Sequence, residues 1–404
     1  MNSGDTAFML VATAMVMFMT PGLALFYGGL VRSKNVLATT MQSFFCLGLI
    51  SIIWVLYGYS LAFGPDIGGF IGGLDYLGLK NVTTGIGPYS DTIPDLLFCG
   101  FQLMFAIITP ALITGAYAER MKFTAFVLFT ALWSTLVYFP VCHWVWGGGW
   151  LGAMGALDFA GGTVIHINSG AAALVTVIVL GKRKGWGREA MHPHNLPMTI
   201  LGAGVLWFGW FGFNAGSALA AGPLAALALF TTQVATGAGA ISWVLAEWKI
   251  QGKPTTLGAV SGAVAGLVAI TPAAGFVSPL SAILIGLVAG VICYLMVLVK
   301  AKLGYDDALD VVAVHGVGGL WGALATGLFA SIAANPDGAN GLFYGNAHQF
   351  LVQAIGAGAA ITYSMILTFI ILKVINAVIG LRVEVDEEVQ GLDVTEHREV
   401  GYTF

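Results

Sequence analysis

The sequence predicts an all-α integral membrane protein with eleven membrane-spanning helices. The first observation is composition: of 404 residues, 58% are hydrophobic and 9% are charged, and the mean hydropathy is +0.87. A soluble domain carries about 25% charged residues, so a water-soluble fold could not cover this much apolar surface. The formal net charge is −4, and no basic run indicates a nucleic-acid partner. Membrane lipid is therefore the expected surroundings.

The second observation is the recurrence of apolar stretches of about 20 residues, the length that crosses a bilayer. The last stretch exceeds this length, so we expect it to tilt or to project into water. The eleven expected spans are residues 7–31, 39–63, 94–118, 124–145, 160–180, 198–218, 224–246, 256–275, 280–299, 309–332 and 347–380. Residues 1–380 then form the membrane domain, and residues 381–404 form a tail.

The third observation is the distribution of lysine and arginine over the loops, which alternate between the two sides of the membrane. Lys80 is alone on one side, and Lys373 lies within the last span. The other side carries Arg32, Lys34, Arg120, Lys122, Lys182, Arg183, Lys184, Arg188, Lys249, Lys253, Lys300, Lys302, Arg382 and Arg398. Because cytoplasmic loops are rich in basic residues, we expect the N-terminus outside and the tail in the cytoplasm.

The first ten helices divide into two groups of five, residues 7–180 and 198–332, and helix 347–380 stands apart. A repeat with an odd number of helices enters the membrane from the opposite side the second time. This inverted repeat is typical of transporters. The four cysteines lie singly in apolar segments and predict neither a metal site nor a disulfide framework. The first apolar run follows no basic region and is too long for a cleavable signal peptide.

Two histidines occupy matching helices of the two repeats. His166 lies in DFAGGTVIHINSGAAALV and His315 in DVVAVHGVGGLWGAL, and each is followed four residues later by a glycine, Gly170 or Gly319. An ionisable ring at membrane depth is costly and therefore indicates a functional site. Interhelical hydrogen bonding is the first alternative. Zinc binding is the second, but no HExxH motif, cysteine or carboxylate completes a metal site.

Asp158 and Asp310 each stand at an expected helix start. The simplest interpretation is that each carboxylate caps its helix by accepting from free backbone N–H groups. For Asp158, a compatible second role is a negative field outside the membrane that attracts a cation. His166 follows Asp158 by eight residues, which is roughly 12 Å deeper along a helix.

Aromatic residues gather on one face of the third helix and at the expected outer ends of the fourth and sixth. They are Phe101 and Phe105 in the third helix, Trp146 at the end of the fourth, and Trp210 and Phe213 in the sixth, which Ser217 follows. An aromatic belt at the membrane interface explains most of them. The alternative is a cage of ring faces that holds a small cation, with one hydroxyl accepting its hydrogen bond. Spacing alone does not choose the members of such a cage.

These residues lie in motifs that resemble the ammonium transporter, methylammonium permease and Rhesus family, in particular its ammonium transporter branch. The motifs run from residue 21 to residue 397 and therefore cover nearly the whole chain. They are PGLALFYGGLVRSKNVL, YGYSLAFG, FQLMFA, GAYAERMKF, WGGGWL, GALDFAGGTVIHINSG, PHNLP, WFGWFGFNAGSA, ITPAAGFV, VHGVGG, GLRV and GLDVTEH.

The resemblance implies a role for each of these aromatic residues. Trp146, Phe105 and Ser217 resemble the outer ammonium-binding site of the family, with Phe101 beside it. Phe105 and Phe213 resemble the stacked phenyl gate below that site.

It also implies roles along the pore. His166 and His315 resemble the paired pore histidines, hydrogen-bonded to one another, and Trp210 resembles a pore-lining tryptophan. Asp158 resembles the acid of the outer vestibule. The family forms homotrimers with one pore per subunit, and a PII signalling protein often blocks its bacterial and archaeal members from the cytoplasm. No cofactor or metal is implied.

The expected substrate is ammonium, with methylammonium as a related cation. A bare cation would pay a large desolvation cost in an apolar path, and only ammonium can avoid this cost by giving up a proton. Three other functions are weighed against transport of ammonium: an ammonium sensor acting through the tail 381–404, a membrane enzyme with a histidine–metal site, and a transporter of another substrate. Unwound midplane helices would favour the last, but the patterns around His166 and His315 are unbroken.

Overall fold

The first half of the chain forms a helical unit interrupted by one extended loop. The structure is a computed structural model, and it describes residues 1–403. Its α-helices in this half are α1 (Ser3–Leu30), α2 (Val36–Ile53), α3 (Tyr59–Phe63), α4 (Asp95–Tyr117), α5 (Phe123–Trp133), α6 (Phe139–Trp146), α7 (Trp150–Ala153) and α8 (Asn168–Leu180). Turns of π-helix at Trp54–Gly58 and Ser134–Tyr138 join α2 to α3 and α5 to α6, so each pair is one continuous span.

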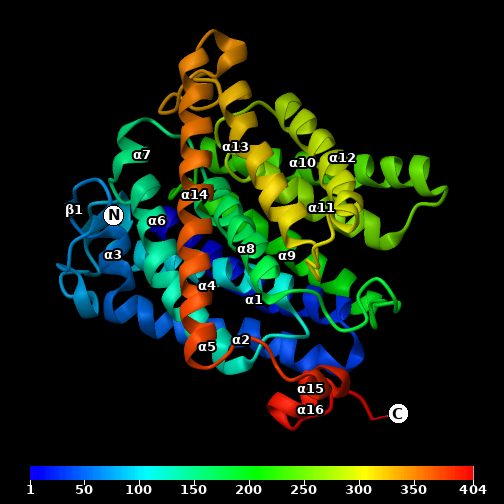
Figure 1. Cartoon of the computed structure of the whole chain (residues 1–404). Helices are drawn as coiled ribbons and strands as arrows, with labels where there is room; N and C mark the ends of the chain where they lie inside the picture. The colour runs from blue at the N-terminus through cyan, green and yellow to red at the C-terminus, as the bar shows by residue number, and fades with distance from the viewer. Residues whose placement is uncertain (404) are drawn as a thin grey trace.

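The second half of the chain is also helical. Its helices are α9 (Leu196–Gly216), α10 (Pro223–Gln251), α11 (Thr256–Ile270), α12 (Pro279–Leu303), α13 (Gly318–Phe329) and α14 (Ala347–Val378). Helix α14 crosses the whole molecule and packs against α5, α8 and α13 (Figure 1). The fold is all-helical, with 71% of the residues in helix.

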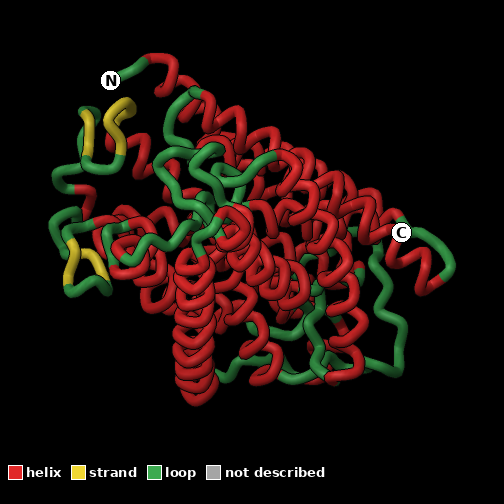
Figure 2. Tube along the Cα trace, turned by 90° about the horizontal axis from the view of Figure 1, so that it is seen from above, coloured by secondary structure: helices red, strands yellow, loops and turns green. Residues whose placement is uncertain are grey.

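Two short antiparallel hairpins lie in the loop between α3 and α4. They are β1 (Asp66–Ile67) with β2 (Ile71–Gly72), and β3 (Ile86–Gly87) with β4 (Ser90–Pro94). The backbone N–H of Asn2 donates to the carbonyl of Thr92 at 2.7 Å, which ties the N-terminus to this loop. Figure 2 shows the hairpins on the side of the N-terminus, with the C-terminus at the opposite end of the molecule.

Ten helical segments of the described chain are long and apolar enough to cross a membrane, and ten of the expected spans are therefore found. The expected span 256–275 differs, because α11 ends at Ile270 and is only 15 residues long. The physical reason is Pro272, which has no N–H to continue the helical hydrogen bonds. The carbonyl of Pro272 instead accepts from the backbone N–H of Phe159 at 3.1 Å.

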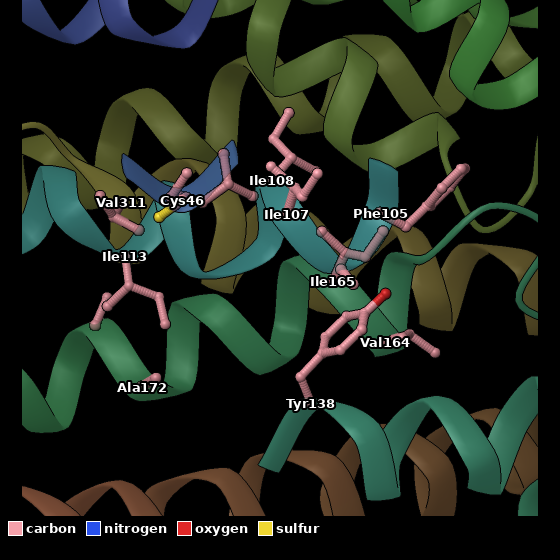
Figure 3. Packing of buried hydrophobic residues seen from close by; sticks show 14 of the residues in the cluster. Cys46, Phe105, Ile107, Ile108, Ile113, Tyr138, Val164, Ile165, Ala172 and Val311 are labelled. Atoms are coloured by element: carbon pink, nitrogen blue, oxygen red, sulfur yellow. The ribbon is translucent and has the colours of Figure 1, made fainter. Parts of the chain in front are cut away.

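The core is centred on α4 and α8, the two spans with the largest buried share. Figure 3 shows Ile107, Ile108 and Ile113 of α4 among the side chains of neighbouring elements, including Ile165 and Ala172. The helix that carries His166 therefore runs through the middle of the bundle.

The tail folds against the membrane domain. It forms α15 (Val385–Gln390) and α16 (Leu392–His397), while Phe404 lies outside the described residues. Arg382 pairs with Met121 in an antiparallel bridge. The carboxylate of Asp393 accepts from the backbone N–H of Ala38 at 2.8 Å, which anchors α16 to the start of α2. The tail thus contacts the loops at one end of the bundle (Figure 1).

Candidate functional site

The two histidines meet at the centre of the bundle. Their Nδ1 atoms are 3.2 Å apart, and their rings are nearly parallel, with planes at 25° and centroids 5.2 Å apart. His166 is 1% exposed and His315 4%. Since one Nδ1 must donate and the other accept, two neutral rings have to be different tautomers. Within residues 1–403, the Nε2 atom of His166 has no hydrogen-bond partner, so it is available to a molecule beside the pair.

Each histidine lies in a first helical turn of π type, Gly162–Ile167 before α8 and Val312–Val317 before α13. The backbone N–H of His166 donates five residues back, to the carbonyl of Gly161, at 3.1 Å. Wide turns of this kind occur often at functional sites. Both helices remain continuous, as their sequence patterns predict, but their starts are wound differently from an ordinary α-helix.

The two glycines that follow the histidines allow the two segments to cross closely. A Cβ added at Gly170 would overlap the backbone of Gly316. A Cβ added at Gly319 would lie 2.8 Å from the Cβ of His166. Any side chain at these positions would therefore push the histidine-bearing segments apart.

A narrow cavity of about 10 Å³ lies beside the histidine pair, close to the space that one water-sized molecule needs. Trp210 forms one wall, with its ring 5.5 Å from that of His166 and inclined by 22°. The indole N–H of Trp210 donates to Thr271 at 2.9 Å, so it is already satisfied. The remaining lining is apolar: Met19, Leu23, Phe26, Ile108, Leu112, Ile165, Leu206, Phe213 and Val264.

Two stacked phenyl rings separate this cavity from the next one. Phe105 of α4 and Phe213 of α9 have centroids 4.3 Å apart and planes at 22°. Phe213 lines the central cavity, and Phe105 lines the outer one. The stacked pair therefore lies between the two cavities.

The outer cavity has a volume of about 280 Å³ and brings together Phe105, Trp146 and Ser217. The Trp146 ring stands at 89° to that of Phe105, with centroids 6.0 Å apart. The hydroxyl of Ser217 donates to the carbonyl of Phe213 at 2.8 Å, so its lone pairs are left to accept from a bound molecule. Phe101 packs against Phe105 at 4.8 Å but is not among the residues that line the cavity.

Asp158 caps the helix of His166, as its position in the sequence predicts. Its carboxylate accepts from the backbone N–H groups of Gly161, Gly162, Thr163 and Val164, at 2.6–3.1 Å. With both oxygens so occupied, this carboxylate acts as a fixed charge and does not contact a cation directly. Its backbone carbonyl accepts from the indole N–H of Trp146 at 2.9 Å.

The cap predicted at Asp310 is wrong. Asp310 has a left-handed backbone, with φ of 62°, and its carboxylate pairs with Lys300. Asp307 takes the capping role and accepts from the N–H of Val312 at 2.7 Å. Asp306, Asp307 and Asp310 all precede this helix. The rule that the capping residue stands next to the apolar run selects Asp310, whereas the backbone N–H of Val312 donates to Asp307. Asp310 instead lines an inner cavity of about 60 Å³ together with His315.

A charged network surrounds the start of the second histidine helix. Arg183 pairs with Asp306 at 2.8 Å and with Glu119 at 3.3 Å. Burial opposes ionisation of both acids. Arg183 together with Arg32 outweighs burial at Glu119, and Arg183 together with Arg120 outweighs it at Asp306, so the pKa values of both acids lie below their usual range. Burial raises the pKa of Asp307 to about 6, and its neighbour Asp310 adds to this effect.

Gln353 of α14 is a residue that the sequence analysis missed. Its side-chain amide bonds to both the N–H and the carbonyl of Leu157, each at 2.7 Å. A lone glutamine in an apolar helix gives no signal of its partner, because the partner is loop backbone far away in the sequence. Among the described residues, no three His, Cys, Asp or Glu side chains lie close enough together to hold a metal ion.

Comparison with known proteins shows the family to which the chain belongs. The model of the Ammonium Transporter Family matches residues 7–402. An ammonium transporter of Bacillus subtilis is 55% identical over all of this chain and 99% of its own length. The Archaeoglobus fulgidus ammonium transporter Amt1 is 48% identical over the full length of both chains.

Two solved structures resemble the whole fold. Mep2 of Saccharomyces cerevisiae is 38% identical, with a TM-score of 0.89 over 96% of this chain and 89% of its own. A structure described as a sensor Amt protein is 30% identical, with a TM-score of 0.90 over 98% of each chain. This chain therefore belongs to the ammonium transporter family, and it is a multi-pass membrane protein.

Proposed function

We propose that this chain takes ammonium from an outer site and conducts it as ammonia along the histidine pair. The observation that carries this proposal is a series of three cavities. Phe105 and Phe213 separate the outer cavity from the central one, and His315 lines both the central and the inner cavity. The series runs through the middle of a helical bundle whose spans are long enough to cross a membrane.

Capture relies on Trp146, Phe105 and Ser217. Ring faces attract a small cation, and an oxygen lone pair accepts one of its N–H bonds. Asp158 adds a fixed negative charge beside this site, because Trp146 donates to its backbone carbonyl. This arrangement does not by itself distinguish ammonium from potassium, which has a similar size and the same charge.

Discrimination arises at the gate. The central cavity accommodates about one small molecule between apolar walls, so a cation would lose its hydration there without replacement ligands. Ammonium can leave a proton behind and enter as neutral ammonia, whereas potassium cannot. The free Nε2 of His166 is suited to accept a hydrogen bond from ammonia. If the proton follows along the histidines, transport is electrogenic, and if it returns outside, transport is neutral.

The finer architecture is part of the same proposal. It comprises eleven spans with α11 as the short eighth, an outer N-terminus, a cytoplasmic tail and two inverted five-helix repeats. It also includes a homotrimer with one pore per subunit and a PII protein as the partner at the cytoplasmic face. The docked tail supports the last point, because it presents a folded surface at that end of the bundle.

An ammonium sensor is the second candidate function. The likeness to a sensor Amt protein over 98% of each chain favours it. The tail also provides a means of output: Arg382 and Glu388 pair at 2.6 Å, and Glu388 accepts from the backbone N–H of Lys184. In this reading, ammonium binding alters the docking of the tail, and a partner recognises the change.

Proteoliposomes containing the purified protein test both functions. An ammonium jump is compared with a potassium jump, and His166→Asp is measured in parallel. We expect an ammonium-specific current, or internal alkalinisation if transport is neutral, and potassium conduction only in the variant. A potassium current equal to the ammonium current in the unaltered protein contradicts the mechanism. Absence of both signals favours the sensor.

A further inference from the structure

Gln353 of α14 is buried at a junction of three elements, and it is 3% exposed. Its Oε1 accepts from the backbone N–H of Leu157 at 2.7 Å and from Gln349 at 3.3 Å. Its Nε2 donates to the carbonyl of Leu157 at 2.7 Å and to that of Ala323 in α13 at 3.2 Å. The two donors and two acceptor sites of this amide are thus all occupied.

The backbone that Gln353 holds adjoins the outer cavity. Leu157 is followed directly by Asp158, whose carbonyl accepts from the indole N–H of Trp146. Two hydrogen bonds from Gln353, to the N–H and to the carbonyl of Leu157, fix both the position and the orientation of this backbone. A single hydrogen bond would leave the backbone free to rotate. The carbonyl of Asp158, which orients the Trp146 ring, therefore lies one residue away from the backbone that Gln353 holds.

The same amide also reaches the pore. Ala323 belongs to α13, which continues directly from the π-helical turn that carries His315. Gln353 therefore connects the wall of the outer cavity to the helix of the second histidine. Gln349, one helical turn earlier, donates to the carbonyl of Gly155 at 3.0 Å and to the Oε1 of Gln353 at 3.3 Å, but it does not contact Leu157 itself.

A purely structural role would be to satisfy polar backbone groups of an irregular segment inside an apolar bundle, which is costly to leave unpaired. Such a role predicts loss of stability but no selective change in the affinity for ammonium. Hydrogen bonds and one peptide bond connect Gln353 through Leu157 and Asp158 to Trp146. This connection predicts a change in the affinity for ammonium in addition to any loss of stability.

We propose that Gln353 is a positioning residue that sets the orientation of Trp146 over the outer cavity and links it to α13. The inference rests on the proposed function, because it takes Trp146 to be part of the ammonium site. It adds a residue from α14, outside both five-helix repeats, to the determinants of ammonium affinity.

The test measures transport against ammonium concentration in proteoliposomes, using current or alkalinisation, whichever the unaltered protein shows. Gln353→Leu is expected to raise the half-saturating concentration about fivefold, as loss of about 1 kcal/mol implies, with little change in maximal rate. Gln349→Leu is the matched control: it removes the 3.3 Å hydrogen bond to Gln353 but keeps both 2.7 Å contacts of Gln353 with Leu157, so we expect it to stay within about twofold. If Gln353→Leu does not fold, Gln353→Asn replaces it, since an amide one methylene shorter cannot hold Leu157 at both points.

A double-mutant cycle separates positioning from general structure. Trp146→Phe removes the indole N–H, so adding Gln353→Leu should raise half-saturation by clearly less than the product of the single effects. If the effects of the two substitutions on half-saturation simply multiply, or if only the maximal rate changes, the inference is overturned and the proposed function stays in place. If Trp146→Phe alone does not change half-saturation, both the capture site and this inference fail.

Discussion

Asp158 and Asp307 each stand eight residues before one of the two paired histidines, and each caps the π-helical turn that carries that histidine. Asp158 precedes His166 and accepts four backbone N–H groups. Asp307 precedes His315 and accepts from Val312. The two halves of the molecule thus start their histidine helices in the same way. The two caps differ in their surroundings: Asp158 lies beside the outer cavity, whereas Asp307 lies within a cluster of charged groups.

Removing the Asp158 carboxylate should destabilise the protein. Asp158→Ala leaves four buried N–H groups without an acceptor, and we expect a loss of at least about 2 kcal/mol and of ammonium transport. Thermal unfolding of the purified protein measures the first effect, and the proteoliposome assay measures the second. Asp75→Ala, on an exposed side chain of the loop between α3 and α4, is the control. An unchanged unfolding midpoint would refute the capping role.

Gly170→Ala should separate the two histidine segments. The new methyl group would overlap the backbone of Gly316, so we expect a destabilisation of about 1–3 kcal/mol and a loss of transport. Gly204→Ala in α9 is a suitable control, because a Cβ there meets nothing within 4 Å. Normal transport by Gly170→Ala would show that the segments can shift without consequence.

Asp307 should make stability fall as pH rises from about 4 to about 6. Its folded pKa, about 6, lies above the ordinary value of 3.8, so the folded state binds the proton more tightly in this interval. The size of the effect is at most about 3 kcal/mol. Unfolding midpoints at pH 4.5 and 7 for the unaltered protein and for Asp307→Asn measure it, and the variant should lose this component.

Asp306 and Glu119 should act in the opposite direction. Because their folded pKa values are lowered, their contribution is complete above the ordinary pKa values and is lost as pH falls through the folded ones. A drop in stability below about pH 4 is therefore expected. Arg183→Gln should reduce this drop, since Arg183 is the partner common to both acids. A drop of the same size in that variant would assign the acid sensitivity to other groups.

Glu388→Gln should release the tail. The Glu388 carboxylate is buried and joins Arg382 to the backbone of Lys184, so loss of its charge weakens two contacts at once. Limited proteolysis of the purified protein should then cleave residues 381–403 faster than in the unaltered chain. Glu399→Gln, on an exposed side chain, is the control and should leave the cleavage rate unchanged.

Much of this architecture could be predicted from the sequence because membrane spans depend on composition and length alone. The histidine pair was also predictable, since ionisable rings in apolar helices are conspicuous. Asp307 was not, because three aspartates precede the same helix and only the backbone shows which one accepts from Val312. Gln353 gave no signal either, because its partner is backbone nearly two hundred residues away. The early end of α11 was partly foreseeable, since Thr271–Pro272 marks an interruption.

The facing Nδ1 atoms of the histidine pair give the hydrogen bond between the two rings a direction. When His166 carries the Nδ1 proton, its Nε2 is an acceptor and the Nε2 of His315 is a donor, and the opposite assignment exchanges these two ends. The histidine pair therefore has two opposite arrangements of donor and acceptor. They differ only in the positions of the protons, and no heavier atom moves. On the proposed path, a molecule that enters from either side would meet a matched first partner, so the same rigid pair would serve inward and outward passage.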